Sequence, residues 1–474
     1  MSFNSYTFII FFGIVLAVNY LLLSLRFRKI NLLIASYLFY GAWNPVLVVL
    51  PLISTTVDWF TSKRIYCESN KYRRYFFLGI SLFVNLGMLS FFKYTGFIVK
   101  NVSYLLELLN IHYKAISPEI ILPLGISFFT LQSLTYTLDI YRRKAKPWHS
   151  FLDFALYVCF FPKVANGPIT RAFEFLPQAQ KVGQGASSKI GWGFCLILIG
   201  LFEKVVVADG LLAPVADKVF GEMEVSNTLV AWAGALAFTG QIFCDFAGYS
   251  SCAIGVALCL GFELPSNFKY PYAAVGFSDF WRRWHISLSS WLRDYLYISL
   301  GGNRKGKIRT YLNLMATMLL GGLWHGASWT FVLWGGLHGL YLIFERLGKK
   351  IMPESPHWNR LPIRLLLGLL TFALVCIAWV LFRANTFEQA FIIFKAMFGC
   401  GLGRSAVRVE YFYILLTFAV MFVMLAAHWM VRDKPLKEIV EKMPWWVRSI
   451  GIAILLIAIV TCSGDDRAFI YFQF

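Results

Sequence analysis

The stretch LNLMATMLLGGLWHGASWTFVLWGGLHGLYLIF, from Leu312 to Phe344, runs for 33 residues without a formal charge. As a single α-helix rising 1.5 Å per residue it would be about 50 Å long, whereas the hydrocarbon core of a bilayer is about 30 Å thick. The stretch must therefore tilt, break or form two helices. Gly321, Gly322 and Gly326 are the expected breakpoints, and they surround His325.

The rest of the chain is similarly apolar. Of its 474 residues, 58% are hydrophobic, 18% are aromatic and only 15% are charged, a composition too apolar for a soluble protein. We predict an all-α, polytopic integral membrane protein with roughly ten to thirteen membrane helices, some of them re-entrant or broken. Because short loops can join such helices into one intramembrane body, we expect a single domain over residues 1–474.

Uncharged runs of about 17 residues or more predict the spanning helices. They cover residues 6–25, 30–57, 76–92, 120–138, 228–244, 246–262, 365–382 and 411–431. Shorter apolar runs at 154–161, 190–202 and 449–464 are ambiguous between tilted spans, re-entrant pieces and buried helices. Pro162 and Pro168 bracket a stretch that we expect to be irregular.

The net charge of +19 indicates membrane orientation rather than nucleic-acid binding, because the Lys and Arg residues form short clusters between apolar runs. The basic cluster after the first run predicts an N-terminus outside the cytoplasm. The nine Cys residues are scattered without a CxxC pair, so neither a zinc site nor a disulfide framework is indicated. Hydrolase, ATPase, metalloprotease and nucleotide-dependent reductase motifs are all missing from the sequence.

The segment from Ser278 to Leu296 has the pattern of an amphipathic helix at the membrane interface, with Ser278 or Asp279 as its N-cap. Its three tryptophans (Trp281, Trp284 and Trp291) would anchor the apolar side, and its arginines (Arg282, Arg283 and Arg293) would face headgroups or a polar cavity. His285 lies near the edge between these faces, so it could reach inward. A purely structural helix is an equally open interpretation.

Three polar residues in apolar surroundings are candidates for chemistry. An apolar environment favours a neutral imidazole at His325, which can accept a proton, but a structural hydrogen bond to a carbonyl of the broken helix is equally possible. For His338 we favour the structural alternative. Asp245, with Tyr249 four positions later, is a functional candidate because charge inside a membrane is rare, although a hydrogen-bonding bracket between helices explains it as well.

Four blocks carry a family resemblance. In chain order they are ILPLGISFFTLQSLTY (121–136), DFAGYSS (245–251), SDFWRRWHISLSSWLRDYLYISLGGNRKG (278–306) and LLGGLWHGASWTFVLWGGLHG (319–339). Together they resemble the membrane-bound O-acyltransferases, and within that family the bacterial branch that acetylates polysaccharides. The resemblance extends over about residues 1–346, so residues 347–474 are expected to add C-terminal membrane helices.

The resemblance implies helices around a tunnel through the bilayer, with His325 as the essential catalytic residue and His285 as the second signature residue. It implies acetyl-CoA or a similar acyl thioester as co-substrate, with no bound cofactor and no metal. The acceptor would be an extracytoplasmic polysaccharide: an alginate-like exopolysaccharide, cellulose or peptidoglycan. The protein would lie among the lipids of the bacterial inner membrane and act with a periplasmic or membrane-anchored SGNH-type transferase.

Further residues are tentative binding candidates for the donor or substrate. They are Trp281, Arg282, Arg283, Asp245, Tyr249 and Asn303, with Arg304 and Lys305 as additional phosphate-binding candidates. For the basic residues, the alternative is that they only set membrane topology. An exposed amide near Gly321–Gly322 is the expected oxyanion donor. Asn166 and the Ser251–Cys252 pair depart from the family pattern, which leaves the acceptor polymer open.

Two other classes of protein remain as alternatives. A polytopic transporter of glycans or lipid-linked sugars would also be basic and aromatic-rich, and a non-catalytic scaffold could serve a partner transferase. Neither of them requires His325 for making a bond.

Overall fold

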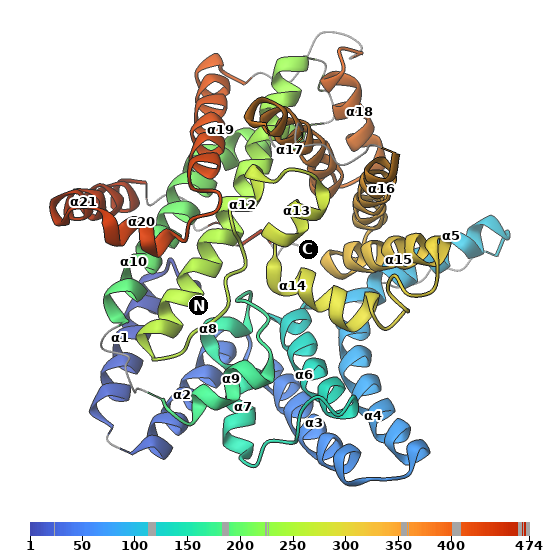
Figure 1. The fold of residues 1–474 in the computed structure, drawn as a ribbon, viewed down its shortest axis with the longest axis vertical. Coiled ribbons are helices and arrows are strands. Elements are labelled where there is room, and N and C mark those ends of the chain that lie inside the picture. Colours follow the sequence, from blue (N-terminus) through green and yellow to red (C-terminus); the bar gives the residue numbers. More distant parts are fainter. Residues whose placement is uncertain are drawn as a thin grey trace. The chain divides into compact units, whose positions relative to one another are not determined.

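The computed structural model describes residues 1–22, 24–111, 120–182, 189–222, 225, 227–351, 358, 360–400, 409–462, 467 and 469–470. Across these residues every regular element is a helix, which confirms the predicted all-α class (Figure 1). In the same part of the chain, six helical stretches are long and apolar enough to cross a membrane, and two shorter helices are apolar as well. The protein is a polytopic membrane protein.

Contacts divide the chain into two compact units. The first comprises residues 1–197 and 252–265, and the second comprises residues 198–251 and 266–474. The expectation of a single domain stays a prediction.

Polar side chains join three helices of the first unit. Its helices are α1 (Tyr6–Leu21), α2 (Leu25–Gly41), η1 (Pro45–Val48), α3 (Val49–Cys67), α4 (Lys71–Leu89), η2 (Ser90–Tyr94), α5 (Thr95–Leu108), α6 (Ile126–Tyr141), α7 (Phe151–Cys159), α8 (Phe161–Val164) and α9 (Ala172–Ala179). Asp58 of α3 accepts hydrogen bonds from Asn85 Nδ2 and Ser81 Oγ of α4, and Ser54 Oγ lies 3.0 Å from Ser133 Oγ of α6. Such contacts hold helices together where lipid offers no hydrophobic drive.

Two long helical stretches contain the points in the sequence at which the chain passes from one unit to the other. One joins α10 (Ile190–Leu201), the π-helical η3 (Phe202–Leu212) and α11 (Ala213–Gly221), and the other is α12 (Thr228–Cys259). The remaining helices of the second unit are η4 (Pro271–Ala273), α13 (Phe277–Arg283), α14 (Ile286–Trp291), η5 (Leu292–Tyr297), α15 (Lys307–His325), α16 (Trp329–Ile351), α17 (Leu361–Arg383), α18 (Phe387–Met397), α19 (Tyr411–Val431), α20 (Leu436–Lys442) and α21 (Trp445–Thr461).

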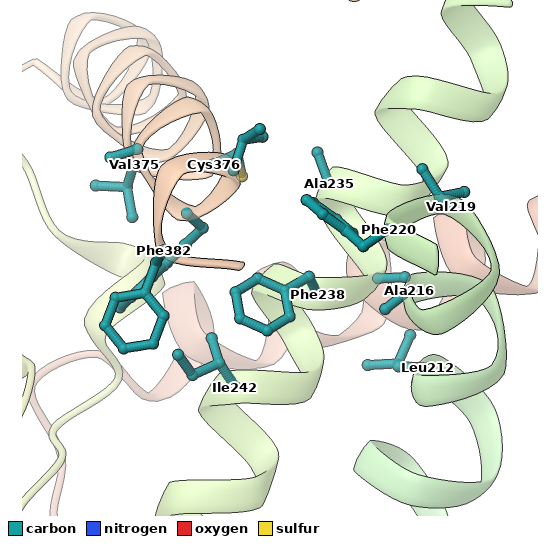
Figure 2. Close-up of a cluster of buried hydrophobic side chains, with 14 of the residues drawn as sticks. Leu212, Ala216, Val219, Phe220, Ala235, Phe238, Ile242, Val375, Cys376 and Phe382 are labelled. Atoms are coloured by element: carbon teal, nitrogen blue, oxygen red, sulfur yellow. The ribbon is translucent and has the colours of Figure 1, made fainter. Parts of the chain in front are cut away.

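An apolar core lies where α12 meets α17 and α11 (Figure 2). Phe238 of α12 stands 5.8 Å from Phe220 of α11 and 6.4 Å from Phe382 of α17, measured between ring centroids. Phe382 belongs to this core and also contacts one of the histidines described below.

The predicted break at Asp245 is wrong, because the separate runs 228–244 and 246–262 form the single helix α12. Asp245 forms an ion pair with Lys204 of η3, so its charge is compensated inside the helix bundle. A search for uncharged runs cannot anticipate a partner 41 positions away.

The Leu312–Phe344 stretch divides at Gly326, as predicted, but Gly321 and Gly322 are not breakpoints. Both lie inside α15, and a Cβ on Gly322 would stand 2.2 Å from the carbonyl oxygen of Phe331 in α16. Gly322 therefore serves the close packing of α15 against α16, whereas a Cβ on Gly321 would stand 3.1 Å from Leu292 of η5. Figure 1 shows where α15 and α16 lie in the fold. The amides of Gly321 and Gly322 lie within α15, and the oxyanion donor expected near them stays a prediction.

Other boundaries follow the apolar runs to different degrees. The runs 365–382 and 411–431 correspond closely to α17 and α19. The run 30–57 breaks because α2 ends at Gly41 and Pro45 begins η1. The run 120–138 becomes helical only at Ile126, after Gly125 with φ of +66°.

Candidate active site

The predicted single helix from Ser278 to Leu296 is broken at His285. Its first part, α13, ends at Arg283, and α14 begins at Ile286, while His285 between them has φ of +42°. The N-cap is Gly276 rather than Ser278 or Asp279. Asn267 explains the break, because its carbonyl accepts the Ile286 N–H at 2.9 Å in place of a helical partner.

This geometry turns His285 into the protein interior, where its side chain is fully buried. The Phe246 ring packs edge-to-face against the imidazole of His285, with 4.6 Å between ring centroids. Burial lowers the pKa of His285 to about 3, so the imidazole is neutral at physiological pH. Only a few per cent of non-glycine residues have positive φ, and such strained positions are concentrated at functional sites.

His325 ends α15 and is 4% exposed. Its ring centroid lies 6.2 Å from that of His285, 5.2 Å from Trp334 and 5.6 Å from Phe382. The fold therefore brings together the two histidines that stand forty positions apart in sequence. Two buried imidazoles within an aromatic wall form a site where proton transfer is shielded from bulk water.

Arg283 does not face headgroups, because it is held by acidic side chains. Its guanidinium donates to Asp279 at 2.9 Å and to Asp433 at 3.1 Å, and Arg432 also pairs with Asp279. Burial alone would raise the pKa of Asp279, but the Val275 N–H and the two arginines hold it below its ordinary value. The hydrogen bond from Arg283 likewise lowers the pKa of Asp433. Arg283 thus ties α13 to the segment that follows α19.

The other tentative donor-binding residues of this region lie closer to solvent. Arg282 is exposed on α13, and Asn303, Arg304 and Lys305 are exposed in the loop between η5 and α15. Trp281 is partly buried, with its ring 5.9 Å from Trp334.

Asp245 and Tyr249 are buried on α12 and contact other elements than the histidines. Asp245 accepts a hydrogen bond from Lys204 and another from the Ile470 N–H at 3.0 Å. The Tyr249 ring lies tilted against the Phe469 ring, with 4.9 Å between centroids. Asp245 thus makes the hydrogen bonds expected of a bracket between helices, and its role in binding stays a prediction.

Sequence reasoning missed Phe246, Trp334 and Phe382, which line the two histidines. Trp334 lies nine positions after His325 in the same block, so its apolar aromatic ring was a usable signal, whereas Phe382 lies beyond the recognised region.

His338 is fully buried against Phe280, with 5.9 Å between ring centroids, and neither of its ring nitrogens has a hydrogen-bond partner within the described residues.

Comparison with known proteins identifies the family of the chain. Residues 98–386 match the membrane-bound O-acyltransferase family. The chain is 40% identical to a probable alginate O-acetylase of Pseudomonas aeruginosa, over 85% of this chain and 75% of that protein. It belongs to the membrane-bound O-acyltransferase family. As a member of that family, it is an acyltransferase.

Two further relatives of this acyltransferase differ in the polymer they are named for. A peptidoglycan O-acetyltransferase of Helicobacter pylori is 37% identical over 80% of this chain and 76% of its own length. A teichoic acid D-alanyltransferase of Bacillus subtilis is 29% identical over 56% of this chain and 70% of its own.

Proposed function

We propose that this acyltransferase moves an acetyl group from an acyl thioester, acetyl-CoA or a similar donor, toward hydroxyl groups of an extracytoplasmic polysaccharide, with His325 as general base. The observation that carries the proposal is the approach of His285 and His325 to 6.2 Å between ring centroids within a buried aromatic wall. These histidines come from the two sequence blocks with the most specific family resemblance.

The reaction needs a base because an alcohol is a weak nucleophile at neutral pH. The Nε2 or Nδ1 of a neutral His325 removes the hydroxyl proton as the oxygen attacks the thioester carbonyl, which forms the C–O ester bond. The C–S bond breaks, and the imidazolium returns its proton to the thiolate. A positioned general base contributes about 10²- to 10⁴-fold to the rate.

The donor is expected to approach through exposed basic groups. Arg282, Arg304 and Lys305 are exposed together with Asn303, and guanidinium and ammonium groups bind the phosphates of a CoA-type donor well. Arg283 is committed to Asp279 and Asp433, so we leave it out of the donor site.

The acceptor is proposed from the relatives, whereas the location and the partner are proposed from the family resemblance of the sequence and from its charge pattern. Alginate-like exopolysaccharide is the first candidate acceptor because the alginate O-acetylases share the highest identity among the relatives described, and peptidoglycan is the second. We place the protein in the bacterial inner membrane with its N-terminus outside the cytoplasm and an SGNH-type transferase as partner.

The test is the O-acetyl content of cell polysaccharides in cells that carry His325→Ala at matched protein level. Loss of O-acetyl groups with normal polymer export supports the proposal. Unchanged acetylation with lost export would assign a transporter, and unchanged acetylation in the His285→Ala, His325→Ala double variant would assign a scaffold.

A further inference from the structure

The C-terminal residues Phe469 and Ile470 are bound to the centre of α12. The backbone N–H of Ile470 donates to Asp245 Oδ2 at 3.0 Å, while Lys204 Nζ donates to the other carboxylate oxygen. Lys204 also donates to Asp209 at 3.0 Å. Both oxygens of the buried Asp245 are therefore used, one by η3 and one by the C-terminal residues.

Phe469 extends this contact to His285. It is 4% exposed, and its ring centroid lies 4.9 Å from Tyr249 and 5.8 Å from Phe246. Phe246 is fully buried and presents its ring to His285 at 4.6 Å with an interplanar angle of 88°. A continuous line of ring contacts thus connects Phe469, Phe246 and His285.

A second anchor holds the same part of the chain. Arg467 pairs with Asp217 of α11, and Asp217 also binds Arg383 of α17 at 3.0 Å. Arg467 and Ile470 are thereby fixed to different helices, with Phe469 between them. This arrangement keeps Phe469 packed against α12.

The strained backbone of His285 needs packing contacts on its side chain to hold it in place. A non-glycine residue with positive φ persists only where its surroundings over-determine it, at about 1–3 kcal/mol of strain. Asn267 holds the residues that follow His285. Its carbonyl oxygen accepts the Ile286 N–H at 2.9 Å, and its side-chain Oδ1 accepts the Ser287 hydroxyl at 2.6 Å. The ring of Phe246 contacts the imidazole of His285 itself.

We infer that Phe469 and Ile470, held by Asp245, form a positioning element that fixes the imidazole of His285 through Phe246. The inference rests on the proposed function for its catalytic consequence, but the packing of His285 can be measured without substrate. Phe469 acts through Phe246 and is a positioning residue.

The experiment compares the full chain with Phe469→Ala, using Phe398→Ala as the matched control because Phe398 is 65% exposed. Purified protein in lipid nanodiscs is treated with diethyl pyrocarbonate, which modifies accessible neutral imidazoles, and modification of His285 is followed by peptide mass spectrometry. Phe469→Ala should speed modification of His285 at least about tenfold because the lost ring leaves a cavity that favours local opening. Phe398→Ala should leave it unchanged.

Activity provides the second measurement. In Phe469→Ala, kcat should fall while the donor KM stays near wild type, and Phe469→Leu should restore part of kcat by refilling the space. If Phe469→Ala fails to fold, Ile470→Pro removes the N–H that binds Asp245 together with the buried isoleucine side chain, and it should expose His285 in the same direction.

Wild-type protection of His285 together with wild-type kcat in a folded Phe469→Ala variant would overturn the inference. Failure of the proposed function is distinguishable, because it would appear as retained acetylation in His325→Ala while the protection of His285 still depended on Phe469.

Discussion

At the scale of single residues, the two histidines differ in how their backbones are held. His325 ends a regular helix, whereas His285 occupies a left-handed conformation between α13 and α14. Backbone conformation and imidazole chemistry at position 285 can therefore be separated by substitution.

Asparagine tolerates positive φ, and a β-branched residue does not. We expect His285→Asn to retain thermal stability near wild type but to lose acyl transfer, because it preserves the backbone and removes the imidazole. His285→Val should lose about 1–2 kcal/mol of unfolding free energy in addition. Thermal unfolding in detergent and transfer assays measure the two effects, and equal stability of both variants would contradict the role of the backbone.

His338 is a third buried histidine, for which we expect a structural role. Its nitrogens have no hydrogen-bond partner within the described residues, and an unsatisfied buried polar group costs about 1–3 kcal/mol. His338→Phe should therefore keep activity and leave the melting temperature unchanged or higher. A large loss of transfer in a stable His338→Phe protein would show that His338 takes part in the reaction.

At the scale of elements, glycine spacing fixes how closely α15 and α16 pack. Gly322 faces the carbonyl oxygen of Phe331, whereas nothing lies within 4 Å of a Cβ on Gly348. Gly322→Ala should destabilise the protein by about 1–3 kcal/mol or more because backbone cannot move aside easily. Gly348→Ala is the matched control and should gain about 0.5–1 kcal/mol from helix propensity. Equal melting temperatures of the two variants would refute the close-packing role.

The ion-pair cluster at α13 predicts a pH dependence of stability. The folded-state pKa of Asp279 lies below the ordinary value of 3.8 for an aspartate. The stabilising contribution of Asp279 is therefore present above that value and is lost as pH falls through the folded pKa. Asp279→Asn should be less stable than wild type at pH 6, and the gap should narrow below about pH 4. Melting temperatures of both proteins across this pH range measure the difference in stability. A difference that does not change with pH would contradict the stabilising role of the Asp279 carboxylate.

The sequence allowed the helices with long uncharged runs to be predicted, as at α17 and α19. It failed at Asp245 and at Ser278–Leu296, where partners distant in sequence decide the outcome. Lys204 compensates the charge on Asp245, and Asn267 takes the hydrogen bond that would have continued α13. The motif blocks identified His285 and His325, but Phe382 and Phe246 become neighbours of the site only through folding.

At the scale of the whole molecule, the distribution of apolar and charged side chains is that expected of a protein surrounded by lipid. Large apolar side chains on candidate membrane helices are exposed, such as Phe83 at 80% and Phe422 at 72%. In the second unit, Lys204, Asp209 and Asp245 instead form a buried ion-pair cluster. His285 and His325 are likewise buried, among aromatic rings.

The central claim is that His325 acts as the base in acyl transfer, and release of thiol from an acetyl thioester by the purified protein with a polysaccharide acceptor tests it most directly. His325→Ala should lower kcat by about 10²- to 10⁴-fold, with the donor KM near wild type and His338→Phe as a control of normal rate. Wild-type thiol release and ester formation by a folded His325→Ala protein would contradict the claim.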